Sequence, residues 1–343
     1  MNTIEKRNHA LLYGAVAFLS AVFTVLSVII FWPQDAPENI RELTIESGVS
    51  LTQLAHQMKE DKLISNASMF LSAVKIMGKS RNIPVGTFTL KNASNNYFVI
   101  QQLFYSSPIL KKITFIEGWN FNHFMEHISN ELSIPSQEID SLCKNTEFLL
   151  SYGITGGIIE GYLFPDTYFF SENSSAKNVI GTLLREGERF WTPSKLLRAK
   201  KLGFTKHEII TLASIIEGEA VHNEERAIIS AVYHNRLKKN MKLQADPTIQ
   251  FILDDKPRRL LNKDLKVDSP YNTYLYHGLP PGPINSPGEK SIIAALYPEK
   301  NDYLFFVATG NGYHSFSKNE RQHNIAKQKL QKLRKALKRN KNI

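Results

Sequence analysis

Glu217 is the side chain whose position in the sequence most favours chemistry. Thr205 and Glu208 form a capping box, which predicts the start of a helix that continues to Glu217. At about 100° per residue, Glu217 falls on the apolar side of this helix, between Ala213 and Ile210. A helix normally places core residues on that side, so a carboxyl group there needs an explanation.

The same helix is predicted to have a polar side and to end early. Thr211 and Ser214 mark the polar side. Gly218 allows the helix to stop before Glu219. Glu217 is therefore expected to be the last side chain on the apolar side.

A carboxyl group among apolar side chains has a definite chemical use. It resists ionisation and can keep its proton near neutral pH. A general acid that protonates a glycosidic oxygen has the same requirement. The structural alternative is that Glu217 pairs with a buried arginine, Arg226 or Arg236. The geometry of the helix alone leaves both interpretations open.

The segments that follow Glu217 are dense in tyrosine, asparagine and glycine. Such turns suit a cleft lined by stacking rings and amide donors, which is the usual chemistry of sugar recognition. The predicted substrate-binding residues are Glu219, Asn235, Arg236, Gln244, Asp246, Thr248, Tyr271, Asn272, Thr273, Tyr274 and His314. Among these, His314 is expected to shape the cleft or to cap a turn.

Other kinds of chemistry lack their motifs. No Gly-x-Ser-x-Gly, Walker A or Gly-x-Gly-x-x-Gly pattern is present, and no cofactor is predicted. Cys143 is the only cysteine, which excludes an intramolecular disulfide and a cysteine-based metal cluster. No metal site is predicted either, because the histidines after Glu217 are too scattered for a compact ligand pair; they are His222, His234, His277, His314 and His323.

Several ordered motifs resemble one known family. They are Glu117–Trp119, Glu160–Tyr168, Ser214–Glu219, Asn235–Leu237, Leu243–Thr248, Tyr271–Tyr274, Gly278–Gly282 and His314–Phe316. At this spacing they resemble the endolytic murein transglycosylases, the MltG/YceG-like family, over nearly the whole chain. The resemblance implies that Glu217 is the catalytic residue. The sequence departs from the family pattern at Gly218, where a larger polar residue is common.

The resemblance implies a lytic reaction on nascent peptidoglycan strands, which would terminate their elongation. Glu217 would protonate the oxygen of the MurNAc–GlcNAc bond and then, as a base, help the C6 hydroxyl to close a 1,6-anhydro ring. A hydrolase normally needs two carboxylates, and Asp246, Glu219 or Glu224 could supply the second one, so a muramidase hydrolase is an alternative. A non-catalytic glycan-binding scaffold of the cell-wall synthesis machinery is another alternative.

A long apolar segment near the start of the sequence predicts attachment to a membrane. Residues 10–32 contain no charged side chain, and a helix of that length, about 34 Å, can cross a hydrocarbon core of about 30 Å. Lys6 and Arg7 precede it and Asp35 follows it, which predicts a cytoplasmic N-terminus, residues 1–9, and a periplasmic remainder. The apolar core is longer than that of a cleaved signal peptide. We therefore expect a single-pass transmembrane helix in the cell inner membrane.

The exported part is predicted to be α+β, with two modules after a linker at residues 33–40. Residues 41–107 contain the pattern of a small α/β module, and Gly48–Ala55 resembles the strand-to-helix entry of glycan-binding LysM-like modules. A plain spacer domain is the alternative. Residues 108–320 are predicted to form the larger α+β catalytic domain.

Most of the net charge of +10 lies at the end of the chain. Residues 318–343 carry ten Lys and Arg against Glu320 alone, so the remainder is close to neutral and no nucleic-acid partner is predicted. The basic tail, residues 321–343, is expected to be a solvated helix or to bind anionic lipid or stem-peptide carboxylates. The predicted partners are peptidoglycan strands and the inner membrane through residues 10–32, with peptidoglycan synthases as further candidates.

Overall fold

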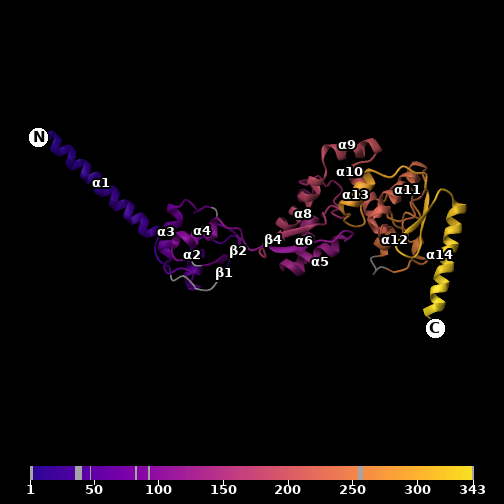
Figure 1. Cartoon of the computed structure of the whole chain (residues 1–343), viewed down its shortest axis with the longest axis horizontal. Helices are drawn as coiled ribbons and strands as arrows, with labels where there is room; N and C mark the ends of the chain where they lie inside the picture. Colours follow the sequence, from indigo (N-terminus) through magenta and orange to yellow (C-terminus); the bar gives the residue numbers. More distant parts are fainter. Residues whose placement is uncertain are drawn as a thin grey trace. The chain divides into compact units, whose positions relative to one another are not determined.

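The computed structural model divides the chain into two compact units. Unit 1 contains Met1–Lys112 and Phe169–Ser174, and unit 2 contains Ile113–Tyr168 and Ser175–Ile343. The structure describes residues 3–34, 41–46, 48–81, 83–91, 93–253 and 258–341, with side chains from residue 9 to residue 335. Helices and strands are mixed in both units (Figure 1). This confirms the predicted α+β class.

Unit 1 begins with the long helix α1 (Thr3–Ile30), drawn in indigo in Figure 1. Its segment His9–Ile30 is long and apolar enough to cross a membrane, and none of its hydrophobic window is buried. A core helix of a soluble domain would be buried, whereas an anchor or a signal sequence would not. The single apolar helix near the N-terminus is therefore confirmed. That it crosses a membrane stays a prediction.

The end of α1 is joined to the rest of unit 1 by a buried amide network. Asn96 Nδ2 donates to the carbonyl of Ile29 at 2.9 Å, and Gln34 Nε2 donates to Asn96 Oδ1 at 2.5 Å. Pro33 forms an isolated bridge with Asn95. Asn96 is fully buried and Gln34 almost so. Of the predicted linker, residues 33 and 34 take part in this packing, and residues 35–40 lie outside the described residues.

The remainder of unit 1 is a small α/β arrangement. Its elements are β1 (Arg41–Ile45), α2 (Leu51–Glu60), α3 (Ala67–Ile76), β2 (Gly86–Leu90) and α4 (Asn96–Phe104). β1 and β2 pair antiparallel, and β1 alternates so that Leu43 and Ile45 face a core that includes Phe70 and Phe88. Ser50 caps α2 in a capping box with Gln53. The LysM-like assignment of this module stays a prediction.

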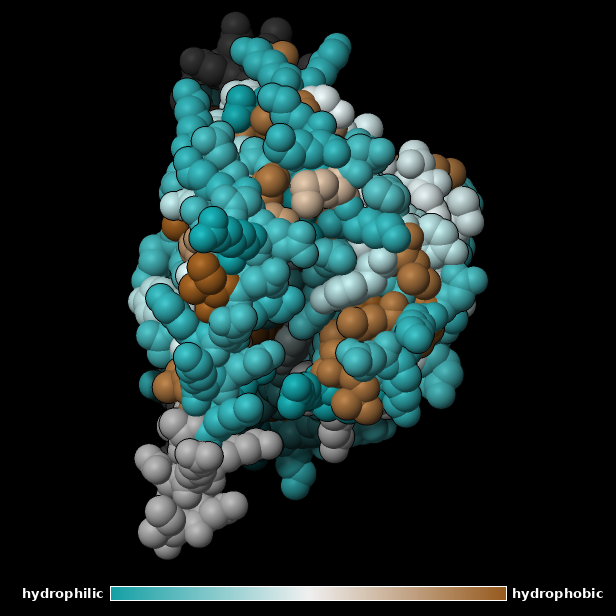
Figure 2. Space-filling view, turned by 90° about the vertical axis from the view of Figure 1, so that its right-hand side faces the viewer, coloured by the Kyte–Doolittle hydropathy of each residue, from teal (hydrophilic) through white to brown (hydrophobic). Residues whose placement is uncertain are grey.

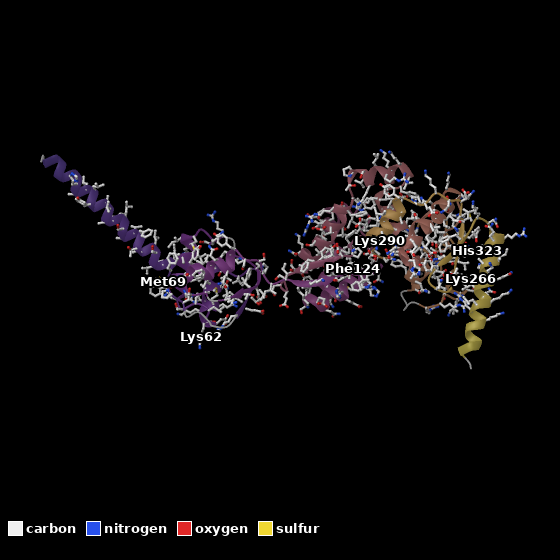
Figure 3. All side chains as sticks on the ribbon, viewed as in Figure 1. Lys62, Met69, Phe124, Lys266, Lys290 and His323 are labelled. Atoms are coloured by element: carbon white, nitrogen blue, oxygen red, sulfur yellow. The ribbon has the colours of Figure 1, made fainter. Side chains whose placement is uncertain are left out.

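The first part of unit 2 is mostly helical. Its elements are β3 (Lys111–Thr114), α5 (Phe121–Leu132), α6 (Ser136–Cys143), α7 (Thr146–Leu150), β4 (Thr167–Phe170), α8 (Ala176–Phe190) and α9 (Pro193–Leu202), with the outer ends of β3 and β4 assigned to unit 1. β3 and β4 form a two-stranded sheet. Phe115 stacks on Phe124, labelled in Figure 3, with 5.1 Å between ring centroids. Trp119 meets the same ring edge-on at 5.9 Å. Phe124 therefore anchors the turn that lies between Phe115 and Trp119.

The second part of unit 2 is built around helix α10. Its elements are α10 (Lys206–Glu219), the 3-10 turn η1 (Asn223–Glu225), α11 (Arg226–Lys238), α12 (Asp246–Leu253), the 3-10 turn η2 (Asp264–Lys266), α13 (Glu289–Leu296), β5 (Phe305–Ala308), β6 (His314–Ser317) and α14 (Glu320–Lys341). α10 packs against α11, α12 and α13, and Leu212 and Ile215 on it are fully buried. β5 and β6 form an antiparallel hairpin. The predicted basic tail is helix α14, on which Leu330 is mostly buried.

Two details of α10 differ from the sequence prediction. The helix has no polar side, because Thr211 and Ser214 are as deeply buried as its apolar residues. The Ser214 hydroxyl donates to the carbonyl of Thr211 and accepts the N–H of Ile284, which satisfies it inside the core. The helix also continues through Gly218 to Glu219. A Cβ at Gly218 would lie 2.7 Å from Pro247, so close packing rather than helix termination explains this glycine.

Candidate active site

Glu217 lies near the C-terminal end of α10 with both carboxylate oxygens engaged. Oε1 accepts a hydrogen bond from Arg226 Nη2 at 3.0 Å, and Oε2 accepts one from the backbone N–H of Gly288 at 3.1 Å. Only 7% of the side-chain surface of Glu217 is exposed, and the same fraction is exposed for Arg226. The position of the carboxylate is therefore fixed by α11 on one side and by the start of α13 on the other.

Arg226 is held by three elements at once. Its Nε donates to Asn223 Oδ1 at 3.1 Å, Nη1 donates to the hydroxyl of Ser291, and Nη2 reaches Glu217. Glu217 therefore pairs with Arg226, one of the two arginines that the sequence offered as partners. The other one, Arg236, bonds different groups. A guanidinium at this distance stabilises the ionised carboxylate. That is the form that follows proton donation and that a base step requires.

The turn Glu117–Trp119 lies directly on this carboxylate. Gly118 N–H donates to the carbonyl of Ser286 at 2.8 Å, and Ser286 N–H donates to the carbonyl of Trp119 at 2.8 Å. A Cβ at Gly118, whose φ is +81°, would lie 3.6 Å from Glu217 Cγ. The sequence analysis matched these residues to a family motif without giving them a role, since nothing in the spacing shows that residues 117 and 217 meet.

A second group of polar side chains surrounds Glu219. Tyr233 OH donates to Glu219 Oε1 at 2.9 Å, and Tyr274 OH donates to Asp246 Oδ1 at 2.5 Å. Burial raises the pKa of Glu219 to about 7, although the hydrogen bond from Tyr233 opposes the shift. The environment that the sequence predicted for Glu217, a carboxyl that resists ionisation, is therefore present at Glu219.

Five of the predicted substrate-binding residues have side chains turned to the protein interior. Their amide, guanidinium and hydroxyl groups bond backbone carbonyls or one another; the residues are Asn235, Arg236, Thr248, Asn272 and Thr273. Such bonds fix the shapes of loops and leave few donors for a ligand. These five side chains hold loop backbone and one another in place, and their contact with a sugar stays a prediction.

The remaining predicted residues have different surroundings. Gln244 is exposed and has a left-handed φ of 52°, and Tyr271 packs with 4.9 Å between its ring centroid and that of Phe251. His314 Nδ1 lies 2.9 Å from Glu225 Oε2, and the backbone N–H of His314 donates to Oε1 of the same carboxylate. His314 therefore holds the carboxylate of Glu225, the residue that precedes Arg226.

Glu160 is a buried carboxyl that sequence reasoning did not select. Its Oε2 accepts the N–H of Phe121 at 3.0 Å, and its buried Oε1 has no hydrogen-bond partner among the described residues. Burial raises the pKa of Glu160 to about 7, while the backbone N–H groups of Phe121 and Gly161 oppose the shift. The sequence signal that could have identified Glu160 is its place in the motif Glu160–Tyr168. The next residue is Gly161, at which a Cβ would overlap Pro283.

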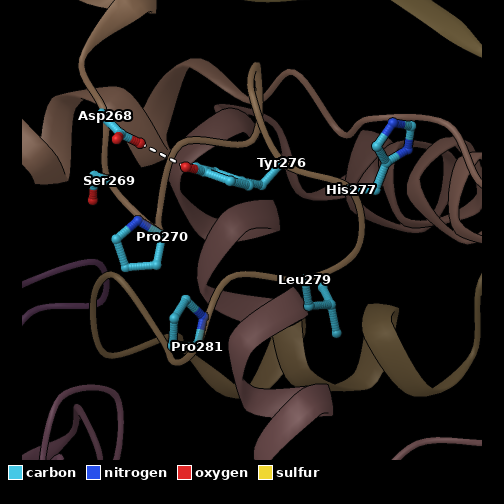
Figure 4. Close-up of a pocket in the computed structure, with 7 residues that line it drawn as sticks. All are labelled: Asp268, Ser269, Pro270, Tyr276, His277, Leu279 and Pro281. Carbon is cyan, nitrogen blue, oxygen red and sulfur yellow. Dashed lines mark hydrogen bonds between the residues drawn. The ribbon is translucent and has the colours of Figure 1, made fainter.

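The pocket drawn in Figure 4 lies away from Glu217. It has a volume of about 560 Å³ and is lined by Asp268, Ser269, Pro270, Tyr276, His277, Leu279 and Pro281. The carbonyl of Pro281 lies 2.7 Å from His207, in the first turn of α10, and the helical rise places His207 about 15 Å from Glu217 along the axis. The face of unit 2 in Figure 2 is largely hydrophilic with scattered hydrophobic patches. Within the described ranges, no group of three His, Cys, Asp or Glu side chains could hold a metal ion.

The chain is similar to curated proteins of two bacteria. It is 33% identical over 303 residues to the endolytic murein transglycosylase of Bacillus subtilis (strain 168), covering 84% of each chain. It is 32% identical over 184 residues to the endolytic murein transglycosylase of Streptococcus pneumoniae serotype 2, which covers 51% of this chain and 33% of that protein.

A solved structure and a family model agree with these similarities. The 2.6 Å crystal structure of a putative yceG-like protein from Listeria monocytogenes matches with a TM-score of 0.58 and 32% identity, over 84% of this chain and 99% of that one. The model of the YceG-like family matches residues 43–329. This range includes the turn at Glu117, Glu217 and Glu219 of α10, and the hairpin that carries His314. The resemblance expected from the motifs is therefore confirmed, and the chain belongs to the YceG-like family.

Proposed function

We propose that the protein is a membrane-anchored endolytic lytic transglycosylase of peptidoglycan. Its relatives in Bacillus subtilis and Streptococcus pneumoniae carry the name endolytic murein transglycosylase. The observation that carries the proposal for this chain is Glu217, a nearly buried carboxylate held by Arg226 and Gly288 within the segment that matches the family. The substrate is the MurNAc–GlcNAc bond of nascent strands, and the product ends in 1,6-anhydro-MurNAc.

The surroundings of Glu217 suit both steps of this reaction. In the first step the carboxyl of Glu217 donates its proton to the glycosidic oxygen as the bond to the anomeric carbon breaks. The carboxylate that remains is stabilised by the charge of Arg226 and by the N–H of Gly288. In that form it assists removal of the proton from the C6 hydroxyl, whose oxygen then closes the anhydro ring without water.

The anchor is helix α1. Its hydrophobic window is exposed along its length, and the basic residues that precede it favour a cytoplasmic N-terminus. Units 1 and 2 then act on the periplasmic side of the inner membrane, where nascent strands are attached at their growing end. The module at residues 41–107 is proposed to bind glycan as a LysM-like module does, and peptidoglycan synthases are proposed partners.

Two isosteric substitutions on α10 test which carboxyl group is the acid. Glu217→Gln keeps the shape of the side chain but cannot donate the proton, so we expect it to lower strand cleavage at least about 100-fold. Glu219→Gln, two residues along the same helix, is the matched control and should retain most activity. The measurement is release of fragments from purified peptidoglycan by the full-length chain in detergent, with product masses read by mass spectrometry.

Each alternative predicts a different result. Products that carry a 1,6-anhydro end weigh one water less than hydrolytic products, so reducing ends of full mass would support a muramidase. Binding of strands without any release of fragments would support a scaffold. Near-normal cleavage by Glu217→Gln together with loss of cleavage by Glu219→Gln would move the acid to Glu219.

A further inference from the structure

Glu117 and Glu217 approach the same backbone position, Gly288. A Cβ built on Gly288 would lie 2.1 Å from both Cδ and Oε1 of Glu117. The N–H of the same residue donates to Glu217 Oε2 at 3.1 Å. With standard backbone bond lengths, these contacts place the two carboxyl groups within about 8 Å of each other. Only a glycine leaves room for the Glu117 carboxyl at this point.

A second contact brings the two residues together independently. Gly118, the neighbour of Glu117, lies against the side chain of Glu217, with 3.6 Å between its ideal Cβ and Glu217 Cγ. The backbone of this turn is tied to Ser286 by two hydrogen bonds of 2.8 Å, and the ring of Trp119 packs on Phe124. The backbone of Glu117 is therefore held beside Glu217.

Glu117 differs from the other carboxyl groups near α10 in having no hydrogen-bond partner among the described residues. Its side chain is exposed, and no ion pair to it is found within the described ranges. Glu219 bonds Tyr233, Asp246 bonds Tyr274, and Glu224 bonds Tyr313. These are the three carboxylates that the sequence analysis offered as second acids, and each has a phenol hydroxyl as a partner. Glu117 is the carboxylate that a bound sugar can reach.

We propose that Glu117 is a second catalytic carboxylate, the base that removes the proton from the C6 hydroxyl while Glu217 protonates the glycosidic oxygen. This inference rests on the proposed transglycosylase function and divides its two proton transfers between two side chains. A separation below about 8 Å falls in the range in which paired carboxylates serve one glycosidic bond.

The proton balance of this step closes without a further reactant. The bond from the anomeric carbon to the leaving oxygen breaks, and its electron pair stays on that oxygen, which takes the proton of Glu217. The C6 oxygen forms the new bond to the anomeric carbon and gives its proton to Glu117. After the turnover Glu117 is protonated and Glu217 ionised. Because Glu117 is exposed, its proton returns to water, from which Glu217 is reprotonated.

Three variants of the full-length chain test this division of roles on soluble, uncross-linked glycan strands. We expect Glu117→Gln and Glu117→Ala to lower kcat about 100-fold, as loss of a general base does, with KM changed less than threefold. Formate, a small carboxylate, should raise the activity of Glu117→Ala at least tenfold. Glu126→Gln, which alters an exposed glutamate on α5 of the same unit, is the matched control and should keep normal kinetics. Far-UV circular dichroism checks that each variant is folded.

The outcomes separate this inference from the proposed function. Normal kcat in Glu117→Gln, a change confined to KM, or no effect of formate on Glu117→Ala would overturn the role of Glu117 and leave Glu217 as a single acid and base, provided that Glu217→Gln is inactive. Cleavage by Glu217→Gln at the normal rate would instead overturn the proposed function and the role of Glu117 with it. Loss of kcat with rescue by formate supports the assignment of Glu117 as the base and Glu217 as the acid.

Discussion

Glu217 and Glu219 stand two residues apart on α10 and have opposite electrostatic surroundings. Glu217 meets a guanidinium and a backbone N–H, which stabilise its ionised form. Glu219 meets a phenol hydroxyl and lies near Asp246, and burial raises its pKa to about 7. Ionisation of Glu219 will therefore contribute to the pH-rate profile of this protein.

Glu160 gives a residue-scale prediction about stability and pH. Its folded pKa of about 7 lies above the ordinary value of 4.5, so the folded state binds more protons between these pH values and stability falls as pH rises through that window. The stabilising effect of the protonated carboxyl is complete below pH 4.5. We expect Glu160→Gln to be more stable than the wild type at pH 8 by roughly 1–3 kcal/mol, with little difference at pH 4.5.

The measurement is the thermal unfolding midpoint of the full chain at the two pH values. The amide can keep the bond to the N–H of Phe121 and does not ionise, which is why a gain at high pH is expected. Glu126→Gln, at an exposed position, should show no such gain. Equal midpoints for Glu160→Gln and the wild type at both pH values would contradict the raised pKa.

At the scale of elements, local patterns in the sequence predicted more than the contacts between elements. The capping box at Thr205 is local, and the structure has it at the predicted residues. The burial of Thr211 and Ser214 is not local, because it depends on which helices cover α10. For the same reason no spacing rule could show that the turn at Glu117 lies on Glu217, a hundred residues away.

The start of α13 carries an element-scale prediction. Gly288→Ala adds a methyl group where the Glu117 carboxyl now lies, and the φ of −71° at this residue accepts alanine. The flexible end of Glu117 should move away, so we expect activity to fall at least tenfold with a loss of stability below about 1 kcal/mol, as at other N-cap positions. Cleavage rate and thermal midpoint are the two readouts.

A double-mutant comparison identifies the cause of that loss. If the methyl group acts by displacing Glu117, Gly288→Ala should have little further effect in the Glu117→Ala background. If the losses of activity caused by the two substitutions add up, Gly288→Ala acts through the backbone N–H that holds Glu217.

At the scale of the whole molecule, the proposed anchor has a consequence for which glycan strands the protein would meet. A surface-confined enzyme has a high effective concentration for a surface-confined substrate. Nascent strands are attached to the membrane at one end, whereas finished strands in the wall are not. The proposed anchoring through α1 therefore favours internal cuts in strands that are still growing.

A variant without the anchor tests this argument. A cleaved signal peptide would replace residues 1–28, and Ile29 would be kept because its carbonyl accepts the bond from Asn96. At equal protein levels, we expect longer glycan strands than in cells with the intact chain, measured by chromatography of strands freed of peptides. Unchanged strand lengths would show that the anchor serves only to retain the protein, and would leave the role of Glu217 untouched.

The amide network among Ile29, Gln34 and Asn96 has a consequence for release from the membrane. Asn96 is fully buried and depends on the last turn of α1 for one of its partners. A protease that cut between the apolar helix and the rest of unit 1 would have to pull this segment out of its packing first. It would then leave a buried amide donor without an acceptor, at a cost of about 1–3 kcal/mol. Release of a soluble form is thus opposed by the packing of Asn96 against the end of α1.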